Sequence, residues 1–201
     1  MADVHFFYGL GSRYSYIAAT QIARIVAETS ATFIWYPVFS GRLIEQSQHD
    51  PFARQNRRGQ YEDAYRITDA LRWARYYSIP YREPNVEGVD WSQIIRACIA
   101  ARYMGEVERY SLAVYADVFA DASPPRTIER LVAVATKVGL DAARFRSLLD
   151  SDVVAHEEVD ILRRASQIGV FGVPTFVVAG ERFWGQDRIP LLLHHLKNNA
   201  H

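Results

Sequence analysis

Two short motifs place chemically useful residues at the ends of expected secondary structure. In the first, residues 12–15 (Ser-Arg-Tyr-Ser), two serines stand three positions apart where an aromatic segment gives way to a helical pattern. Serine is a favoured N-cap residue, and a hydroxyl beside the positive end of a helix dipole favours a negatively charged group. In the second, Val173-Pro174 directly precedes an apolar run typical of a strand. Ser12 is therefore expected to cap this helix.

The other reactive residue types do not combine into a site. Adjacent His194 and His195 would point about 100° apart on a helix, so they cannot share a metal ion. Asp152 and His156 have i,i+4 spacing, but a third ligand is missing from their neighbourhood. Cys98, the single cysteine, lies in an apolar helical stretch and is expected to be a small buried hydrophobe. We therefore expect no bound metal and no internal disulfide.

An α/β organisation must position the two motifs. Apolar runs at 4–8 and 32–36 flank a helical pattern that begins after Ser12 and continues past residue 20, which predicts a β-α-β start and a sheet covered on both faces. Strand patterns return at 173–178 and 183–184, and an amphipathic last helix begins at about residue 187. Between these ends, helical patterns cover 60–77, 91–104, 107–119, 127–138, 142–149 and 154–168.

The two ends of the chain therefore predict one sheet that is interrupted by an insertion. We expect residues 1–40 and 170–201 to form an α/β domain, and residues 41–169 to form an inserted all-helical domain. Within the insertion, residues 47–59 are polar and are interpreted as a loop or a mobile helix.

Composition excludes several classes of function. The 201 residues carry 23 Lys and Arg against 23 Asp and Glu, so the chain has no basic field that would hold nucleic acid or a membrane surface. A hydrophobic content of 49% is ample for a core. No stretch approaches the ~20 apolar residues of a membrane span, and the first residues lack the pattern of a secretory signal. We therefore expect a cytoplasmic protein.

Together, the two motifs resemble the thioredoxin superfamily, in which Cys-x-x-Cys at a helix start faces a cis-proline before a later strand. Both cysteine positions are serine here, at Ser12 and Ser15, so disulfide exchange through them is impossible. The chain is more similar to a DsbA-like branch without these cysteines, the 2-hydroxychromene-2-carboxylate isomerases and the kappa-class glutathione transferases. The similarity lies in residues 10–18, 72–80, 169–176 and 180–188, which read LGSRYSYIA, RWARYYSIP, GVFGVPTF and GERFWGQDR.

The resemblance implies a thioredoxin-like fold and glutathione as the cofactor. Ser12 would donate a hydrogen bond to the glutathione sulfur. A free thiol titrates near ~8.5, and both the hydroxyl and the helix dipole would favour its thiolate form. By the same resemblance, the backbone of Val173 would bind the cysteinyl part, Pro174 would be cis, and Gln186 and Asp187 would hold the γ-glutamyl end.

The resemblance also implies an activity. The expected enzyme is a glutathione-dependent cis–trans isomerase of aromatic compound degradation, acting on a small aromatic carboxylate of the 2-hydroxychromene-2-carboxylate type, and a homodimer. Arg13, Tyr14 and Trp73 are the candidates for contacting this substrate, although aromatic packing is an alternative role for Trp73. The chain departs from the family at Arg13, which replaces a proline, and at residues 42–51, which lack the usual K-x-x-G-N-x-P-P stretch.

Two other functions remain open at this point. A kappa-like glutathione transferase or peroxidase would share Ser12 but would consume glutathione, so accumulation of a conjugate distinguishes it. A non-catalytic thioredoxin-like binding protein would use the cis-proline groove for peptides, and its ligand affinity would not depend on Ser12. The residue pair Gln186-Asp187 favours the isomerase over both.

Overall fold

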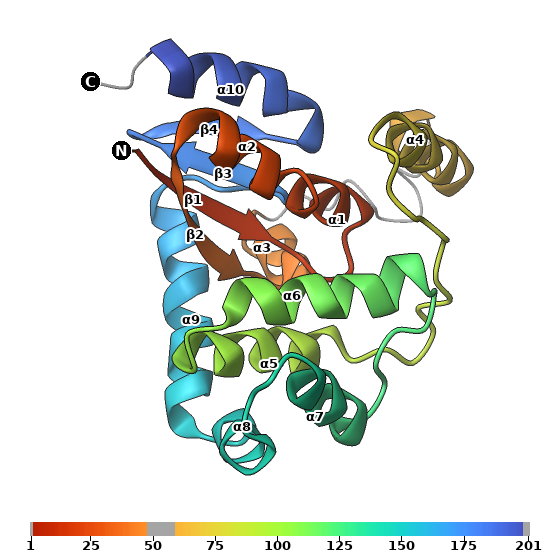
Figure 1. Ribbon diagram of the computed structural model, residues 1–201, viewed down its shortest axis with the longest axis vertical. Helices are drawn as coiled ribbons and strands as arrows, with labels where there is room; N and C mark the ends of the chain where they lie inside the picture. Colours follow the sequence, from red (N-terminus) through yellow and green to blue (C-terminus); the bar gives the residue numbers. More distant parts are fainter. Residues whose placement is uncertain (1, 48–58, 199–201) are drawn as a thin grey trace.

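Strands from both ends of the chain form one sheet in the computed structural model, which describes residues 2–47 and 59–198 (Figure 1). The strands are β1 (Asp3–Tyr8), β2 (Thr32–Pro37), β3 (Thr175–Val178) and β4 (Glu181–Trp184). The helices are α1 (Arg13–Ala19), α2 (Ile22–Thr29), α3 (Ser40–Ser47), α4 (Asp63–Tyr76), α5 (Trp91–Tyr103), α6 (Val107–Tyr115), α7 (Ile128–Lys137), α8 (Ala142–Leu149), α9 (Asp152–Gln167) and α10 (Ile189–Asn198). Short helical turns are η2 (Gly59–Tyr61), the π-helical η3 (Ala116–Ala120) and η4 (Gln186–Arg188).

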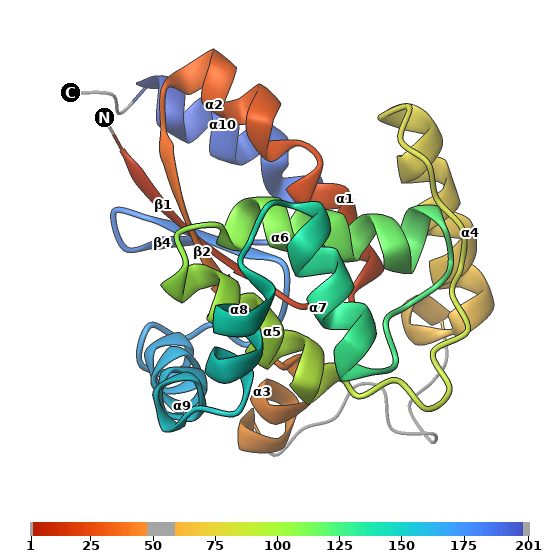
Figure 2. The ribbon, with the colours of Figure 1, turned by 60° about the horizontal axis from the view of Figure 1, so that its bottom comes forward.

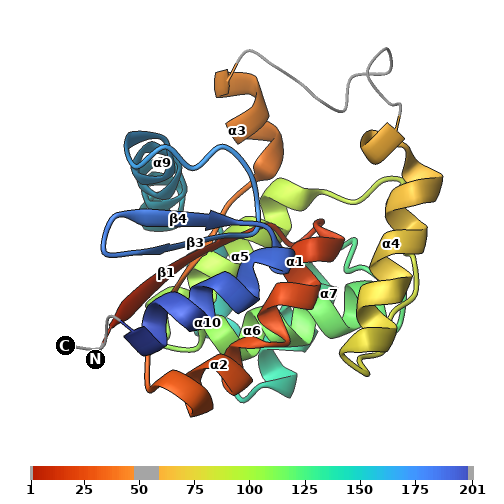
Figure 3. The same cartoon turned by 90° about the horizontal axis from the view of Figure 1, so that it is seen from above.

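The sheet is mixed, with strand order β2-β1-β3-β4. Strand β1 runs parallel to β2 and antiparallel to β3, and β3 runs antiparallel to β4. Helices α2 and α10 cover one face, and α9 lies across the other (Figures 2 and 3). Because both faces are covered, β3 is buried at every position. The predicted β-α-β start and two-sided coverage are confirmed.

Aromatic side chains hold the central strands together. Phe6 of β1 is fully buried and stacks on Tyr8 and on Phe176 of β3, with ring centroids 5.1 Å and 5.0 Å apart. The indole of Trp35, on β2, meets the Phe6 ring edge-on at 5.0 Å. Rings in these geometries gain attraction beyond their buried area. The cluster therefore links three strands, of which β1 leads into the Ser12 motif and β3 follows Pro174.

The helical patterns of the middle segment correspond to α4 through α9, with ends that differ by a few residues. The single helix expected after Ser12 is wrong, because the chain forms α1 and α2 with a break between them. At the break, the Thr20 hydroxyl donates to the Ile17 carbonyl at 2.7 Å, and the Gln21 amide donates to the Ala18 carbonyl at 3.0 Å. These i→i+3 bonds replace the regular ladder and end α1.

The start of the predicted insertion contains a helix that the patterns did not indicate. Helix α3 directly follows β2, where no helix was expected. Residues 48–58, which are most of the segment interpreted as a loop or mobile helix, lie outside the described residues.

The inserted helices share their core with the sheet. The Tyr8 hydroxyl of β1 lies 2.6 Å from the Ser111 hydroxyl of α6, and both side chains are buried. Helix α4 packs against α1 at one side of the molecule (Figure 1). All described strands lie within the two predicted terminal segments, and the division into two domains stays a prediction. Along the described chain, no helix has the length and apolar character needed to cross a membrane.

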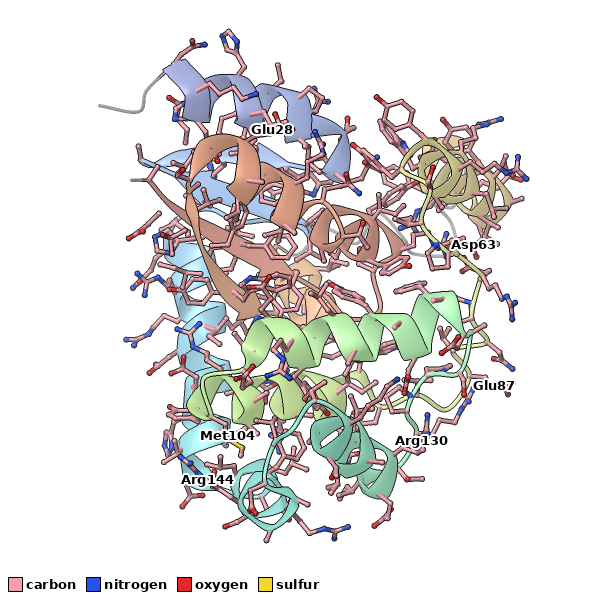
Figure 4. All side chains as sticks on the ribbon, in the orientation of Figure 1. Glu28, Asp63, Glu87, Met104, Arg130 and Arg144 are labelled. Carbon is pink, nitrogen blue, oxygen red and sulfur yellow. The ribbon has the colours of Figure 1, made fainter. Side chains whose placement is uncertain are left out.

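An ion pair links the C-terminal helix α10 to α2, the other helix on the same face of the sheet. Lys197 of α10 contacts Glu28 of α2 with 2.6 Å between Nζ and Oε2, and Arg24 contacts the same carboxylate at 3.0 Å. Figure 4 marks Glu28 on the α2 side of this contact. The hydrogen bond from Lys197 is the main cause that lowers the pKa of Glu28. The pair joins the last helix to α2 across 169 positions of sequence.

Candidate active site

A cavity of about 460 Å³ opens where the start of α1, helix α4 and the Val173-Pro174 segment meet η4. Helix α1 packs against both α4 and η4, so it lies between the two walls (Figure 3). The cavity brings together all but one of the residues predicted from the sequence: Ser12, Tyr14, Trp73, Val173, Pro174, Gln186 and Asp187. Residues from four separated parts of the chain therefore share one site.

Ser12 caps α1 and keeps its own proton available. The Ser15 amide donates to Ser12 Oγ at 3.2 Å, and Ser12 has the extended backbone typical of an N-cap. In this bond Ser12 Oγ is the acceptor, so its O–H can still donate to another group. The hydroxyl is partly exposed to the cavity. The predicted cap is confirmed, and it leaves room for a second role towards an anion.

Buried hydrogen bonds fix the loop that carries Ser12. The amide of Gly9 donates to Ser15 Oγ at 3.3 Å, and the Tyr115 hydroxyl of α6 donates to the Gly9 carbonyl at 3.0 Å. The Ser12 amide donates to the same Gly9 carbonyl at 3.0 Å. Ser15 and Tyr115 are both buried, so these hydrogen bonds are shielded from water. Through Tyr115, helix α6 fixes the position of the loop. The second serine of the motif is thus a support for the first.

Removing the Tyr115 hydroxyl is expected to loosen this loop. Tyr115→Phe should lower the free energy of unfolding by about 1 kcal/mol, because it deletes one buried hydrogen bond. Hydrogen–deuterium exchange in the segment 9–15 should rise at the same time. The matched control is Tyr110→Phe, which removes an equally buried bond to the Leu131 carbonyl away from the cavity. Equal exchange of the segment in both variants would contradict the role given to Tyr115.

The Val173-Pro174 segment and Gln186 offer polar groups that have no hydrogen-bond partner in the described chain. The Val173–Pro174 peptide bond is cis, as predicted. Within the described residues, the backbone N–H and C=O of Val173 take part in no hydrogen bond. Gln186 is 3% exposed, and its side-chain Oε1 is buried with no partner in the described chain. Buried polar groups are normally paired, so these atoms are suited to a bound molecule that donates and accepts hydrogen bonds.

Arg13 does not line the cavity. Its Nη2 lies 2.6 Å from Glu83 Oε1 in the segment between α4 and α5, and the Tyr81 hydroxyl donates to the same carboxylate. The two partners are separated by 70 positions, so no local pattern could predict this pair. Arg13 Nη2 is therefore held by this ion pair outside the cavity lining, while its Nη1 is buried with no partner among the described residues, and a substrate contact for Arg13 stays a prediction.

Helix α4 contributes two charged residues that the sequence reasoning missed. Arg66 and Asp69 line the cavity together with Trp73, and their spacing of i, i+3 and i+7 places them on one face of the helix. The Tyr14 hydroxyl donates to Asp69 Oδ2 at 2.9 Å, and the Arg66 guanidinium carbon lies 5.8 Å from the centre of the Tyr14 ring. The signal was present as spacing in the helical pattern over 60–77. Only the docking of α4 on α1 shows where that face points.

The environment of Tyr14 keeps its hydroxyl protonated to higher pH than that of an ordinary tyrosine. Burial, and then the hydrogen bond to Asp69, raise the pKa of Tyr14 to about 12. At pH 11 a tyrosine with the ordinary pKa near ~10 is about nine-tenths ionised, whereas Tyr14 should be about one-tenth ionised. The phenolate absorbance at 295 nm of wild type minus Tyr14→Phe should therefore remain small at pH 11. If that difference in absorbance at pH 11 corresponded to one fully ionised tyrosine, in protein shown by circular dichroism to be folded, it would contradict the environment described for Tyr14.

One cavity-lining residue, Trp184, belongs to an exposed aromatic pair. Trp184 of β4 lines the cavity and is 49% exposed, and its ring meets Phe171 with centroids 5.0 Å apart. Trp73, on the α4 side, stacks on Tyr77 at 5.7 Å and also borders the cavity. Trp73 therefore combines aromatic packing with a surface that faces the site.

Outside this cavity, the histidines, acidic residues and cysteine considered in the sequence form no reactive site among the described residues. In the part of the chain that is described, no group of three or more His, Cys, Asp or Glu side chains is arranged to hold a metal ion. Cys98 is fully buried in α5, and burial raises the pKa of its thiol to about 12. A protonated, enclosed thiol is unreactive, as its apolar neighbours predicted.

Known proteins match this chain over almost its whole length. The family model of the DsbA-like thioredoxin domain matches residues 3–197. The 2-hydroxychromene-2-carboxylate isomerase of Sphingobium xenophagum is 27% identical over 195 residues, which cover 96% of this chain and 97% of that protein. The isomerase of the same name from Pseudomonas sp. (strain C18) is 25% identical over 195 residues, which cover 94% of this chain and 87% of that protein.

A solved structure shares the fold. The structure of selenomethionine 2-hydroxychromene-2-carboxylate isomerase superposes with a TM-score of 0.84 at 24% identity, covering 98% of this chain and 96% of that chain. The predicted thioredoxin-like fold is confirmed by this match and by the family model. Because that model spans nearly all of its sequence, the chain belongs to the DsbA-like thioredoxin family.

Proposed function

We propose that the protein is a glutathione-dependent cis–trans isomerase of an aromatic conjugated keto acid of the 2-hydroxychromene-2-carboxylate type. The curated relatives carry the name of that isomerase and support an isomerase of the same type. Neither Ser12 nor Ser15 can form a disulfide, which excludes thiol–disulfide exchange at the position where DsbA-like proteins carry their cysteines.

One observation carries the proposal: the cavity combines a donor hydroxyl at a helix start with groups that have no partner among the described residues and that suit a γ-glutamyl tripeptide. The N–H and C=O of Val173, which have no hydrogen-bond partner among the described residues, suit the backbone of a cysteinyl residue, as a sheet edge suits a strand. The buried Oε1 of Gln186 and the carboxylate of Asp187 are acceptors, and an ammonium group has three N–H donors. These groups among the described residues therefore support glutathione as the proposed ligand.

Ser12 has the central role in the chemistry. Its hydroxyl donates to a sulfur placed beside it, and the amides at the start of α1 add the positive end of the helix dipole. Both favour the charged form of the thiol, so they lower its pKa from the ordinary value of ~8.5. When bound beside Ser12, glutathione would supply a thiolate nucleophile for reversible addition to the conjugated double bond. The aromatic rings of Tyr14, Trp73 and Trp184 provide flat apolar surface for the substrate's ring.

The test is an isomerisation assay with trans-o-hydroxybenzylidenepyruvate, followed by its ultraviolet absorbance, with and without glutathione. We expect turnover only when glutathione is present, and no loss of glutathione over many turnovers. Mass spectrometry of the reaction separates the two glutathione enzymes, because a transferase accumulates a conjugate and an isomerase does not. Equal rates with and without glutathione, or no isomerisation at all, would overturn the proposal.

A further inference from the structure

The substrate proposed above carries a carboxylate, and Arg13, a candidate from the sequence for contacting the substrate, lies outside the cavity lining. Arg13 forms its ion pair with Glu83 and does not border the cavity. The described residues that do border it include two cations, Arg66 on α4 and Arg188 in η4. A cation inside a partly enclosed cavity attracts an anion more strongly than one in open water, because the effective dielectric constant is lower.

The two cations differ in their surroundings. Arg188 contacts the neighbouring Asp187 with 3.4 Å between Nη2 and Oδ2, and its side chain is 53% exposed. It belongs to the segment proposed to hold the γ-glutamyl end of glutathione. Arg66 lies on the opposite wall and is only partly exposed. Burial lowers the pKa of Arg66 and the positive charge of Arg13 lowers it further, whereas its neighbours Tyr14 and Asp63 raise it.

The wall around Arg66 has the chemistry of an aromatic acid site. The guanidinium lies over the Tyr14 ring at 5.8 Å, and Tyr61 and Trp73 line the same side of the cavity. Asp63, which Figure 4 labels at the start of α4, is three positions before Arg66, and Asp69 is three positions after it. The Asp69 carboxylate accepts a hydrogen bond from the Tyr14 hydroxyl. This bond fixes the orientation of the Tyr14 ring beneath the Arg66 guanidinium. Arginine is the side chain whose planar fork matches a carboxylate.

We propose that Arg66 binds the substrate's carboxylate and thereby makes the enzyme selective for keto acids over uncharged enones. The inference rests on the proposed function and adds to it the residue that selects the substrate class. Glutathione binding is expected to be independent of Arg66, because Ser12 precedes α1, Val173 precedes β3 and Gln186 begins η4, whereas Arg66 lies on α4.

The test uses two unreactive probes that differ only in the carboxylate. The acid probe is 4-(2-hydroxyphenyl)-2-oxobutanoate and the neutral probe is 4-(2-hydroxyphenyl)butan-2-one, both of which lack the double bond needed for reaction. Their affinities are measured by calorimetry with glutathione present. We expect wild type to bind the acid more tightly than the ketone. Arg66→Gln should bind the acid about tenfold more weakly than wild type does, and its affinity for the ketone should equal that of wild type. Arg66→Lys should keep part of the preference because it keeps the charge.

The control is Arg75→Gln, which removes an exposed arginine from the same helix outside the cavity. It should leave both affinities unchanged. An acid affinity of folded Arg66→Gln within twofold of wild type, or a wild type that does not prefer the acid, would overturn this inference. The isomerisation assay on wild type is judged separately, so a failed inference and a failed function give different results.

Discussion

Ser12→Ala is expected to reduce kcat/KM for isomerisation about tenfold to a hundredfold at neutral pH. A hydrogen bond to a charged group contributes roughly 1.5–3 kcal/mol, and each ~1.4 kcal/mol corresponds to one pKa unit or a factor of ten. Without the hydroxyl, the thiol of bound glutathione should therefore have a higher pKa, and a smaller fraction should be thiolate at neutral pH. The pH profile of kcat/KM should shift towards alkaline pH by the same amount.

The matched control is Ser12→Thr, which keeps both the hydroxyl and the ability to cap α1. It should retain most of the activity, whereas Ser12→Ala also loses about 1 kcal/mol of helix-cap stability. Both variants are compared well below their unfolding temperatures, so that stability does not enter the rates. An unshifted pH profile in active Ser12→Ala would show that the hydroxyl acts only as a cap.

Phe6→Ala is expected to lower the free energy of unfolding by about 3–5 kcal/mol, the usual range for removing a fully buried phenylalanine. The ring has 0% exposure and lies at the junction of β1, β2 and β3. Its loss leaves a cavity against Tyr8, Trp35 and Phe176, and these large rings cannot move together to fill the space. Chemical denaturation gives the free energy directly.

Phe171→Ala serves as the control for Phe6→Ala. Phe171 is 55% exposed, so its removal should change the free energy of unfolding by less than about 1 kcal/mol. If Phe6→Ala fell within 1 kcal/mol of wild type, the aromatic cluster would not be what joins the three strands. The comparison matters for the site because β1 and β3 carry the segments that contain Ser12 and Val173.

Local signals in the sequence predicted those parts of the fold that depend on local chemistry. Ser12 caps a helix because its side chain bonds an amide three residues away, and the apolar run after Pro174 forms a strand buried on both faces. The break between α1 and α2 was missed because it depends on a Thr20 side chain bonding backward to a carbonyl. Helix α3 was missed because its eight residues form too short a pattern to predict a helix without its tertiary contacts.

The site could be predicted where family motifs cover it and not where it depends on docking. Ser12, Val173 and Gln186 lie in matched segments, and the structure brings them to one cavity. The orientation of the Arg13 side chain depends on its ion pair with Glu83. Nothing in the sequence pattern indicated that the segment containing Glu83 lies beside α1. Arg66 and Asp69 face the cavity only because α4 packs on α1, and this packing joins helices far apart in sequence.

The central claim is that Ser12 stabilises the thiolate of bound glutathione. The most direct measurement is a calorimetric titration of glutathione into wild type and Ser12→Ala, repeated in buffers of different ionisation enthalpy to count the protons released. We expect binding in the micromolar to low-millimolar range with proton release at neutral pH in wild type, and markedly less release in Ser12→Ala. Equal proton release in both proteins, or no binding at several millimolar glutathione, would contradict the claim.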